Sequence, residues 1–351
     1  MFENFFYPVI PQDPHLIFGM ASHIDSKYLA IFIKSLRVTA KSSATVILFI
    51  NHGPLDFRTA ELVQTYRLIM IPVNHKTLAP TFLQNYHPSS TRWVLFHRLF
   101  QENQMFLKKY FQLYLSLDIR DSVFQSNPFH LISPPPATPI ASSLAPVAST
   151  TGSTLYVFAE SDSKSIMTCN WNSGWIRDCF GEDGLSKISR QHILCSGVVM
   201  SNTFNAMDEY ILLMSNTLQG YKLLTTNDEI DPTSRFPKCE RNGVDQGVHN
   251  YLIHNRLINP RHRVEIYYPL QFPIINLQSM SDQILPIRQI GYDYDVISMP
   301  GSAQLYALVH QYDRNFQYQK SLAQKYIHWI RWNDQKNGLI SDWSQTLTCT
   351  S

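Results

Sequence analysis

Short apolar runs alternate with amphipathic segments over the first 130 residues of this 351-residue chain. Residues 26–40 carry apolar side chains at helical spacing, and Asp25 before them is a residue type that caps helices. Residues 44–50 (ATVILFI) are apolar almost throughout, as in a strand that is buried on both faces. A helix over residues 55–66 and a strand over 67–73 repeat the unit. This alternation predicts an α/β fold with a Rossmann-like, mostly parallel central sheet flanked by helices.

The same reading extends along the rest of the chain. We expect strands over residues 113–117, 154–159 and 192–200, extended segments over 263–277, and helices over 91–110, 204–218, 244–254 and 317–332. Residues 133–153 contain five prolines and no charged residue, which predicts a flexible, Pro/Ser/Ala-rich surface insertion. The expected organisation is therefore an N-terminal extension (1–20), one α/β domain (21–314) that contains the insertion, and a C-terminal helix and tail (315–351).

Charge and hydropathy exclude two classes of partner. Lys plus Arg number 29 against 27 for Asp plus Glu, and this net charge of +2 gives no reason to expect nucleic-acid binding. No stretch reaches the roughly 18 apolar residues that a membrane-spanning helix needs. The N-terminal residues are interrupted by prolines and lack a basic leader, so no signal peptide is expected. We therefore expect a cytoplasmic protein, or one of the Golgi lumen if an anchor has been removed.

The five cysteines contain no CxxC pair, which disfavours a zinc ribbon or thioredoxin-like chemistry. Buried thiols are the favoured interpretation. The alternative is a disulfide between Cys179 and Cys195, or between Cys169 and Cys239, which would indicate a secretory compartment.

The strongest chemical signal is an apolar run that ends in charged residues, within LYLSLDIRDSVFQSNPF at 113–129. Asp118, Arg120 and Asp121 follow the expected strand directly. In open α/β sheets ligands bind beyond the carboxyl ends of strands, and buried charges there need solvent, a partner or a metal. Paired carboxylates suit Mg²⁺ or Mn²⁺. The alternative is that Arg120 only pairs with Asp118 or Asp121.

Three later segments add polar groups. CSGVVM at 195–200 places Ser196 and Gly197 inside an apolar run, where a glycine permits close approach of a ligand or marks only a bulge. GVDQGVHN at 243–250 gathers Asp245, Gln246 and two further polar residues, His249 and Asn250, which suit sugar hydroxyls or a solvated helix start. LVHQYDR at 308–314 places His310 after an apolar run, where a lone histidine is more often structural.

In this order, the four motifs LDIRD, CSGVVM, DQGVHN and LVHQ resemble those of glycosyltransferases of the type A fold. They are similar in particular to glycogenin-like retaining transferases and to relatives with a DxRDxxFQxxPF segment. The resemblance spans residues 113–314. It implies a hexosyl- or pentosyltransferase that uses a nucleotide-diphosphate sugar donor, a divalent cation (Mn²⁺ or Mg²⁺), and a hydroxyl acceptor on a glycan, a protein or a small molecule.

The resemblance also implies roles for individual residues. Asp118 matches the first carboxylate of the family's Asp-x-Asp motif, but Arg120 stands where the second is expected and Asp121 follows one place later. Asp121 then replaces the missing ligand, or Arg120 supplies positive charge to the diphosphate. His310 matches a late metal-binding histidine. Asp245 and Gln246 match the family's pair near the reacting carbon of the donor sugar. Ser196 and Gly197 match the motif that lines the same pocket. Arg92 matches a basic residue that binds the donor.

Other functions are weighed against this one. One alternative is a sugar-nucleotide-binding protein without catalytic activity, which is supported by the arginine at position 120, where the family's motif has a carboxylate. A nucleotidyltransferase would need a glycine-rich basic loop near the N-terminus, and residues 18–40 show none. The sequence has no G-x-S-x-G, HExxH or Walker motif. A glycosidase ranks last, because Asp118 and Asp121 share one strand end whereas glycosidase carboxylates flank the scissile bond.

Overall fold

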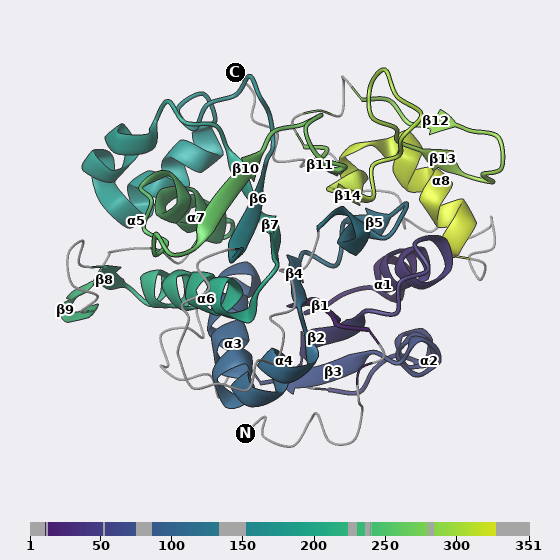
Figure 1. Ribbon diagram of the computed structural model, residues 1–351, viewed down its shortest axis with the longest axis horizontal. Helices are drawn as coiled ribbons and strands as arrows, with labels where there is room; N and C mark the ends of the chain where they lie inside the picture. Colours follow the sequence, from purple (N-terminus) through teal and green to yellow (C-terminus); the bar gives the residue numbers. More distant parts are fainter. Residues whose placement is uncertain are drawn as a thin grey trace, which may run out of the picture.

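The computed structural model describes residues 11, 13–51, 53–74, 86–132, 152–223, 230–235, 239, 241–278, 280 and 284–327. These residues form a central seven-stranded sheet with the order β10-β6-β7-β4-β1-β2-β3 (Figure 1). The strands are β1 (His15–Met20), β2 (Thr45–Asn51), β3 (Ile69–Val73), β4 (Leu113–Leu117), β6 (Thr154–Ala159), β7 (Leu194–Ser201) and β10 (Arg263–Tyr267). Only β7 runs antiparallel to its neighbours. The predicted α/β fold with a mostly parallel central sheet is therefore confirmed.

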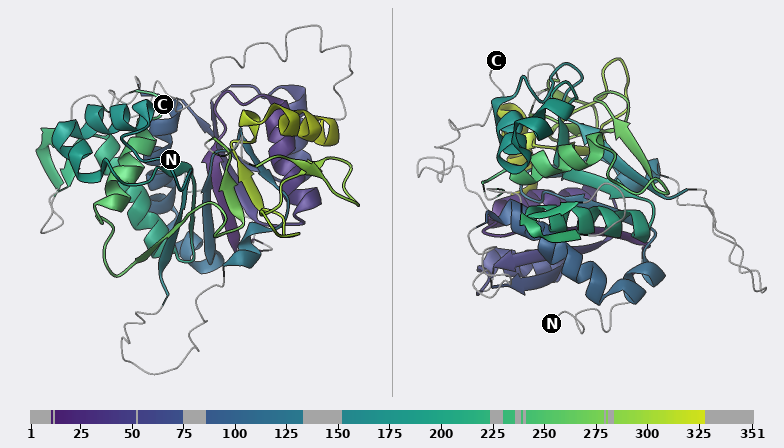
Figure 2. Two further views of the ribbon diagram at one scale, coloured as in Figure 1. Left: turned by 90° about the horizontal axis from the view of Figure 1, so that it is seen from above. Right: turned by 90° about the vertical axis from the view of Figure 1, so that its left-hand side faces the viewer.

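Helices lie on both sides of this sheet (Figure 2). One side carries α1 (Ser26–Lys34), which a π-helical turn (Ser35–Thr39) extends, and α2 (Phe57–Tyr66). The other side carries α3 (Pro88–Glu102), α4 (Gln104–Tyr110), α5 (Asn170–Ile188), α6 (Phe204–Leu218) and α7 (Val244–His254). The C-terminal α8 (Phe316–Tyr326) packs against α1, and Lys34 Nζ donates to the carbonyl oxygen of Tyr326 at 2.8 Å.

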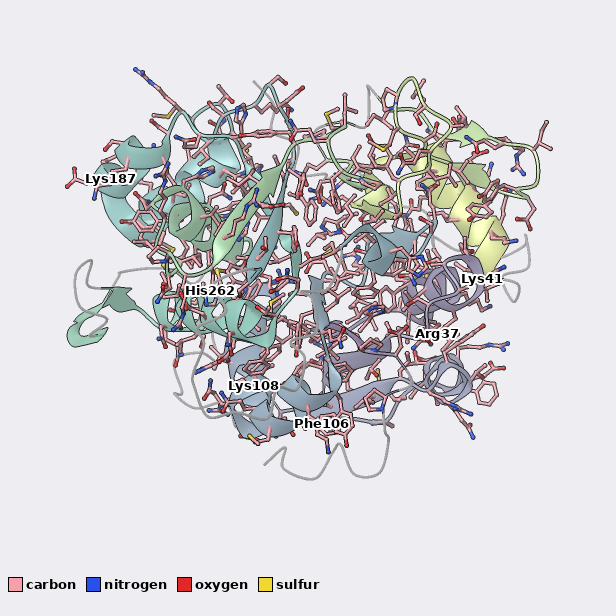
Figure 3. All side chains as sticks on the ribbon, in the orientation of Figure 1. Arg37, Lys41, Phe106, Lys108, Lys187 and His262 are labelled. Carbon is pink, nitrogen blue, oxygen red and sulfur yellow. A yellow bond between two sulfur atoms is a disulfide. The ribbon has the colours of Figure 1, made fainter. Side chains whose placement is uncertain are left out.

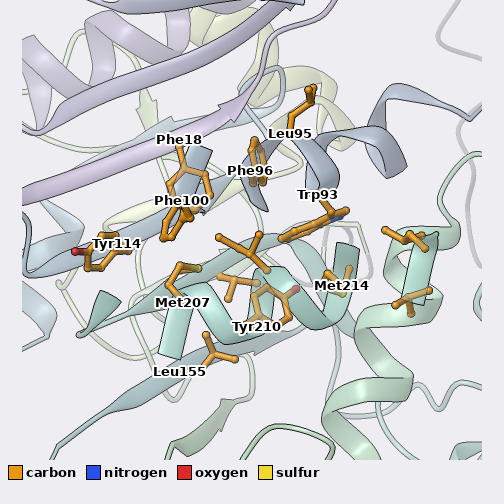
Figure 4. Packing of buried hydrophobic residues seen from close by; sticks show 14 of the residues in the cluster. Phe18, Trp93, Leu95, Phe96, Phe100, Tyr114, Leu155, Met207, Tyr210 and Met214 are labelled. Atoms are coloured by element: carbon orange, nitrogen blue, oxygen red, sulfur yellow. The ribbon is translucent and has the colours of Figure 1, made fainter. Parts of the chain in front are cut away.

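Alternation along the strands divides the apolar core between the two sides. In β1, Leu16 and Phe18 point into the core beneath α3 and α6, whereas Ile17 points into the core beneath α1. The Phe18 ring meets Phe96 of α3 edge to face, with centroids 4.9 Å apart, and this packing is seen in Figure 4. Complete burial of such a side chain is worth roughly 1.5–3 kcal/mol. The two faces of β1 thus fix α1 and α3 on opposite sides of the strand.

A second, three-stranded sheet extends the carboxyl end of β4. It consists of β11 (Ile274–Asn276), β14 (Leu308–His310) and β5 (Ser122–Phe124), in that order. The antiparallel register of β14 and β5 pairs His310 with Ser122, so a residue late in the chain lies beside the segment that follows β4. The remaining short elements are the hairpins β8 (Tyr221–Leu223) with β9 (Ile230–Arg235) and β12 (Ile287–Arg288) with β13 (Asp295–Val296), and the 3₁₀ turns Pro128–Leu131 and Tyr312–Arg314.

Several predicted elements appear with their expected bounds, and others differ for local reasons. The helices over 204–218 and 244–254 are α6 and α7, and Asp25 caps α1 by accepting from the backbone N–H of Lys27 at 2.9 Å. The helix expected over 91–110 is two helices, because Asn103 has non-helical backbone angles (φ −121°, ψ 20°). The sequence did not predict α5, which Gly181 (φ 70°) interrupts.

The expected domain limits can be compared with the structure at three places. Strand β1 lies within residues 1–20, so the sheet begins before residue 21 and the predicted N-terminal extension contributes a central strand. The insertion expected at 133–153 lies almost entirely outside the described residues. The helix expected to reach residue 332 ends at Tyr326 as α8, and residues 328–332 lie outside the description.

The cysteines pair differently from either disulfide weighed above. Cys179 in α5 is bonded to Cys239, with their Cα atoms 4.9 Å apart. The favoured interpretation of buried thiols was therefore wrong for Cys179 and Cys239. It holds for Cys195, a buried free thiol whose Sγ accepts from the backbone N–H of Gly197 at 3.4 Å. The pairings Cys179–Cys195 and Cys169–Cys239 were therefore wrong, because spacing along the chain does not show that residue 239 lies against α5.

Charged side chains are spread around the molecule. Lys41, Lys108 and Lys187 lie at different places on its outline in Figure 3. In the part of the chain that the structure describes, no helix combines the length and the apolar character needed to cross a membrane.

Candidate active site

The predicted polar residues gather where several strands end. Asp118 follows the last residue of β4, and its backbone N–H donates to the carbonyl oxygen of Gly197 at 2.8 Å. Because β7 is antiparallel, its first residues lie at the same edge of the sheet as the last residues of β4. Glu160 follows the last residue of β6 at this edge, and its backbone N–H donates to Ile193 at 2.9 Å. Residues 118, 160 and 197 are thus brought to one edge by the strand directions.

Asp118, Asp121 and His310 form a cluster whose potential metal-ligand atoms all lie within 4.8 Å of one another. Nε2 of His310 is 4.0 Å from Oδ2 of Asp118, and Nδ1 is 3.5 Å from Oδ1 of Asp121. The imidazole is buried, whereas the Asp118 side chain is 36% exposed. The predicted association of these three residues is therefore present.

Hydrogen bonds indicate which nitrogen of His310 carries its proton. The Ser122 hydroxyl donates to the carbonyl oxygen of Asp118 at 2.5 Å, so it accepts from Nδ1–H of His310 at 3.0 Å. The Nε2 lone pair then faces Asp118. Burial lowers the pKa of His310 to about 3, so the ring is neutral at neutral pH. A neutral imidazole beside carboxylate oxygens is the form that binds a metal.

The glycine of the CSG motif leaves open the space in front of this pair. A Cβ atom built on Gly197 would lie 2.7 Å from Oδ2 of Asp118 and closer still to Nε2 of His310. Those two atoms are 4.0 Å apart, which leaves room for one cation that both would hold. Two carboxylates and an imidazole also suit Mn²⁺ better than a purely oxygen-selective ion such as Ca²⁺. The residues present therefore fit a divalent cation.

Arg92 links the two halves of the site. It is 4% exposed, its guanidinium pairs with Oδ1 of Asp118, and Nη2 donates to Oδ2 of Asp245 at 2.9 Å. Ser196 Oγ donates to the same Asp245 oxygen at 3.1 Å, and Trp93 Nε1 approaches it at 3.5 Å. Arg92 Nε is buried without a hydrogen-bond partner among the described residues. Four predicted site residues, Arg92, Asp118, Ser196 and Asp245, therefore form one connected network.

The two charged residues after Asp118 have different surroundings. Burial raises the pKa of Asp121, against the opposing effects of the Arg314 and Arg120 charges. The Arg120 side chain is exposed, and its guanidinium carbon lies 5.3 Å from the centre of the Tyr28 ring. Arg120 thus lies over α1, whereas Asp121 turns toward His310.

The polar residues at the start of α7 divide into two groups. Gln246 is partly exposed, and its Nε2 donates to Asn172 Oδ1 at 3.1 Å. Asn250 is buried and exchanges hydrogen bonds with both backbone groups of Leu194, at 2.9 and 2.8 Å. His249 is buried against the Tyr210 hydroxyl at 2.8 Å, and burial lowers its pKa to about 3. The hydrogen bonds of His249 and Asn250 therefore hold α7 against α6 and β7. These two side chains are not available to sugar hydroxyls, contrary to the interpretation that the whole GVDQGVHN segment binds a sugar.

Two residues beside the site were not predicted. Glu160 follows β6 as Asp118 follows β4, so the signal of a charge after an apolar run was present in the sequence. Arg314 contributes positive charge toward Asp121, His310 and Glu160. It is the last residue of the LVHQYDR segment, and nothing in that segment separates it from an ordinary surface arginine.

We expect Gly197→Ala to weaken Mn²⁺ binding at least tenfold, because the added methyl group would displace Asp118 and His310. Titration calorimetry with Mn²⁺ alone measures this effect. The matched control is Gly174→Ala in α5, where the nearest atom is the flexible end of Arg241. Unchanged Mn²⁺ affinity in a folded Gly197→Ala variant would show that the cation does not occupy this space.

Comparisons with known proteins give similarity in structure only. No family model matches the sequence, and neither does any curated protein. An active-site mutant of LgtC is 12% identical over 91% of this chain and 99% of its own, with a TM-score of 0.46. The galactosyltransferase LgtC in complex with donor and acceptor sugar analogues has a TM-score of 0.45 at 12% identity, over 92% of this chain and 99% of its own. A glycosyltransferase involved in glycosylation of the major capsid of PBCV-1 has a TM-score of 0.39 at 10% identity, over 90% and 99%. These values do not place the chain in a family.

Proposed function

We propose that this protein is a glycosyltransferase that moves a sugar from a nucleotide-diphosphate donor to a hydroxyl acceptor. The observation that carries the proposal is the convergence of a carboxylate–imidazole cluster with the Arg92–Asp245 pair at one edge of the sheet. Such a site needs positive charge for a diphosphate and hydrogen-bonding groups for a sugar, and both are present. The order of motifs that resembles type A glycosyltransferases supports the same function.

Asp118, Asp121 and His310 are the residues that would hold a divalent cation, Mn²⁺ or Mg²⁺. The bound cation would offset the negative charge that develops on the departing nucleotide diphosphate. Arg92 is fixed by its two carboxylate partners beside the proposed cation ligands, and guanidinium groups form strong directed hydrogen bonds to phosphate oxygens, so Arg92 would contact the diphosphate. Asp245 and Gln246 would contact the donor sugar, with Ser196 and Gly197 beside them. The resemblance to retaining transferases extends the proposal to retention of configuration at the reacting carbon.

A thermal-shift screen tests the proposal. UDP-, GDP-, ADP- and CMP-sugars are each added with and without Mn²⁺, and we expect one donor class to raise the melting temperature in a Mn²⁺-dependent manner. A donor present at about 100 times its Kd contributes about 2.7 kcal/mol of apparent stability. Protein in which no donor changes the melting temperature would contradict the proposal.

A non-catalytic nucleotide-sugar-binding protein is the second candidate. The salt bridge between Arg92 and Asp118 favours this candidate, because the guanidinium neutralises part of the negative charge with which Asp118 would otherwise bind a metal. This candidate predicts donor binding in the screen with no release of nucleotide diphosphate against water or any acceptor. Turnover of the donor that binds distinguishes the two.

A further inference from the structure

A single buried hydroxyl group lies between two of the residues that would hold the cation. Ser122 is the first residue of β5 and is 0% exposed. Its Oγ donates to the backbone carbonyl oxygen of Asp118 at 2.5 Å and lies 3.0 Å from Nδ1 of His310. Ser122 was not among the site residues predicted from the sequence, and the proposed function gives it no role.

The pairing of β5 with β14 brings this hydroxyl to the imidazole. The two strands are antiparallel, and Ser122 lies directly opposite His310 in their register. Side chains that are directly opposite in an antiparallel pair lie on the same face of the sheet, with Cβ atoms about 4.5–5.5 Å apart. The contact between Ser122 and His310 is therefore set by the backbone of the sheet and does not depend on a long, flexible side chain.

The same hydroxyl also closes the turn that carries the two carboxylates. Asp118 and Asp121 lie between β4 and β5, and the hydrogen bond from Ser122 to the Asp118 carbonyl spans four residues. The backbone N–H of Asp118 donates to Gly197 at 2.8 Å, and the carbonyl oxygen of Asp121 accepts from the backbone N–H of Tyr312 at 3.2 Å. The turn is thus fixed at both carboxylate residues and, through Ser122, across its width.

The direction of the hydrogen bond between Ser122 and His310 follows from the number of protons available. A serine hydroxyl has one proton, and Ser122 gives it to the Asp118 carbonyl, so it accepts from Nδ1–H of His310. Oδ1 of Asp121 is farther from Nδ1, at 3.5 Å. A neutral imidazole with its proton on Nδ1 has its lone pair on Nε2. Nε2 lies 4.0 Å from Oδ2 of Asp118, beside the space that Gly197 leaves open.

We propose that Ser122 is a positioning residue that fixes the Nδ1–H tautomer of His310 and so keeps Nε2 available to the cation. The proposal rests on the proposed function, because the cation is the one that Asp118, Asp121 and His310 would hold there. Without the serine oxygen, the ring is free to carry its proton on Nε2, and an N–H group at that position cannot bind a cation. Loss of a group that orients a metal-binding histidine usually lowers metal affinity by about 10–100-fold.

Titration calorimetry with Mn²⁺ alone compares Ser122→Ala with the wild-type protein, and we expect the variant to bind Mn²⁺ about 10–100-fold more weakly. Equal Mn²⁺ affinity in the two proteins would overturn the proposal. A wild-type protein that binds no Mn²⁺ in this titration would also overturn it.

Ser201→Ala is the matched control for the loss of a buried hydroxyl. Ser201 is 1% exposed, and its Oγ donates to the carbonyl oxygen of Thr154 at 3.0 Å and accepts from the backbone N–H of Thr203 at 3.2 Å. It is the last residue of β7 and pairs with Tyr114 near the start of β4, at the opposite edge of the sheet from the site. Both variants should melt at a lower temperature than the wild type, but Ser201→Ala should keep wild-type Mn²⁺ affinity. An equal loss of affinity in both variants would show a general effect on the fold and would overturn the positioning role.

The tautomer of His310 provides a readout that needs neither donor nor cation. Nitrogen NMR of isotope-labelled protein at about pH 8, above the ordinary pKa of histidine, distinguishes the protonated ring nitrogen from the unprotonated one. The His310 signals are assigned by their loss in His310→Gln. We expect the proton on Nδ1 in the wild-type protein, and on Nε2 or in exchange between both nitrogens in Ser122→Ala.

Two outcomes of the NMR measurement would overturn the proposal. One is a wild-type ring that is protonated on Nε2, and this result stands even if Ser122→Ala does not fold. The other is an Nδ1–H tautomer that persists unchanged in Ser122→Ala, because another group would then orient the ring. The proposed function fails separately: if no sugar nucleotide changes the melting temperature, Mn²⁺ affinity and the tautomer still decide whether Ser122 positions His310.

Discussion

Arg92→Met is expected to lower the free energy of unfolding by about 3–5 kcal/mol, the cost of removing one partner from a buried ion pair. Arg92 and Asp245 are both almost fully buried, with side-chain exposures of 4% and 3%. Without the guanidinium, the hydrogen-bond donors left to Asp245 among the described residues are the Ser196 hydroxyl and the distant indole N–H of Trp93. The Asp118 side chain is 36% exposed and regains water, so most of the loss comes from Asp245. Urea unfolding measures the change.

Two further variants make this prediction specific. Arg177→Met removes an ion pair to Glu182 whose side chains are 45% and 72% exposed, and we expect it to cost no more than about 1 kcal/mol. In the double variant Arg92→Met/Asp245→Asn no charge is left stranded, so it should be more stable than Arg92→Met alone. An Arg92→Met protein that unfolds like the wild type would show that the pair is not desolvated.

Local sequence signals predicted much of the fold because they act over a few residues. Thr203 caps α6 by accepting from the backbone N–H of Ala206 at 3.3 Å, and the helix has its expected bounds. The order of strands could not be predicted in this way, because β7 enters the sheet between β4 and β6 in the antiparallel direction. The helix α5 was missed because its apolar residues do not form one strong stripe and Gly181 breaks its backbone.

The same division holds for the site. Asp118 was found because a charged residue after an apolar strand is a local pattern, and Glu160 shows the same pattern after β6. The partner of Arg92 could not be read from the sequence, since Asp245 lies 153 residues away. His249 and Asn250 show the opposite error. Their polarity suggested that they bind a ligand, but their side chains make hydrogen bonds within the protein, from α7 to α6 and β7.

Asp121→Ala is expected to reduce donor turnover with Mn²⁺ by about 10²–10³-fold, the usual effect of removing a group that stabilises transition-state charge. Asp121 is one of the three potential ligands and its Oδ1 lies 3.5 Å from Nδ1 of His310, so its loss removes an oxygen ligand and a contact that orients the ring. Release of nucleotide diphosphate from the donor identified by thermal shift measures the effect. Asp183→Ala, at an exposed position of α5, is the control and should keep wild-type activity.

Arg120→Met separates a metal-assisted site from one in which an arginine alone neutralises the diphosphate. The Arg120 guanidinium lies over the Tyr28 ring and Arg120 is not one of the three clustered potential ligands, so its replacement should change turnover far less than Asp121→Ala does. In the metal-assisted site, a chelator abolishes wild-type turnover and added Mn²⁺ restores it. If chelator-treated protein and Asp121→Ala both keep full activity while Arg120→Met loses it, the diphosphate is neutralised by arginine and the three-residue cluster holds no catalytic cation. Arg120 and Asp121 are adjacent in the chain. Opposite effects of Arg120→Met and Asp121→Ala on turnover therefore decide which of these two side chains replaces the carboxylate that the motif has at position 120.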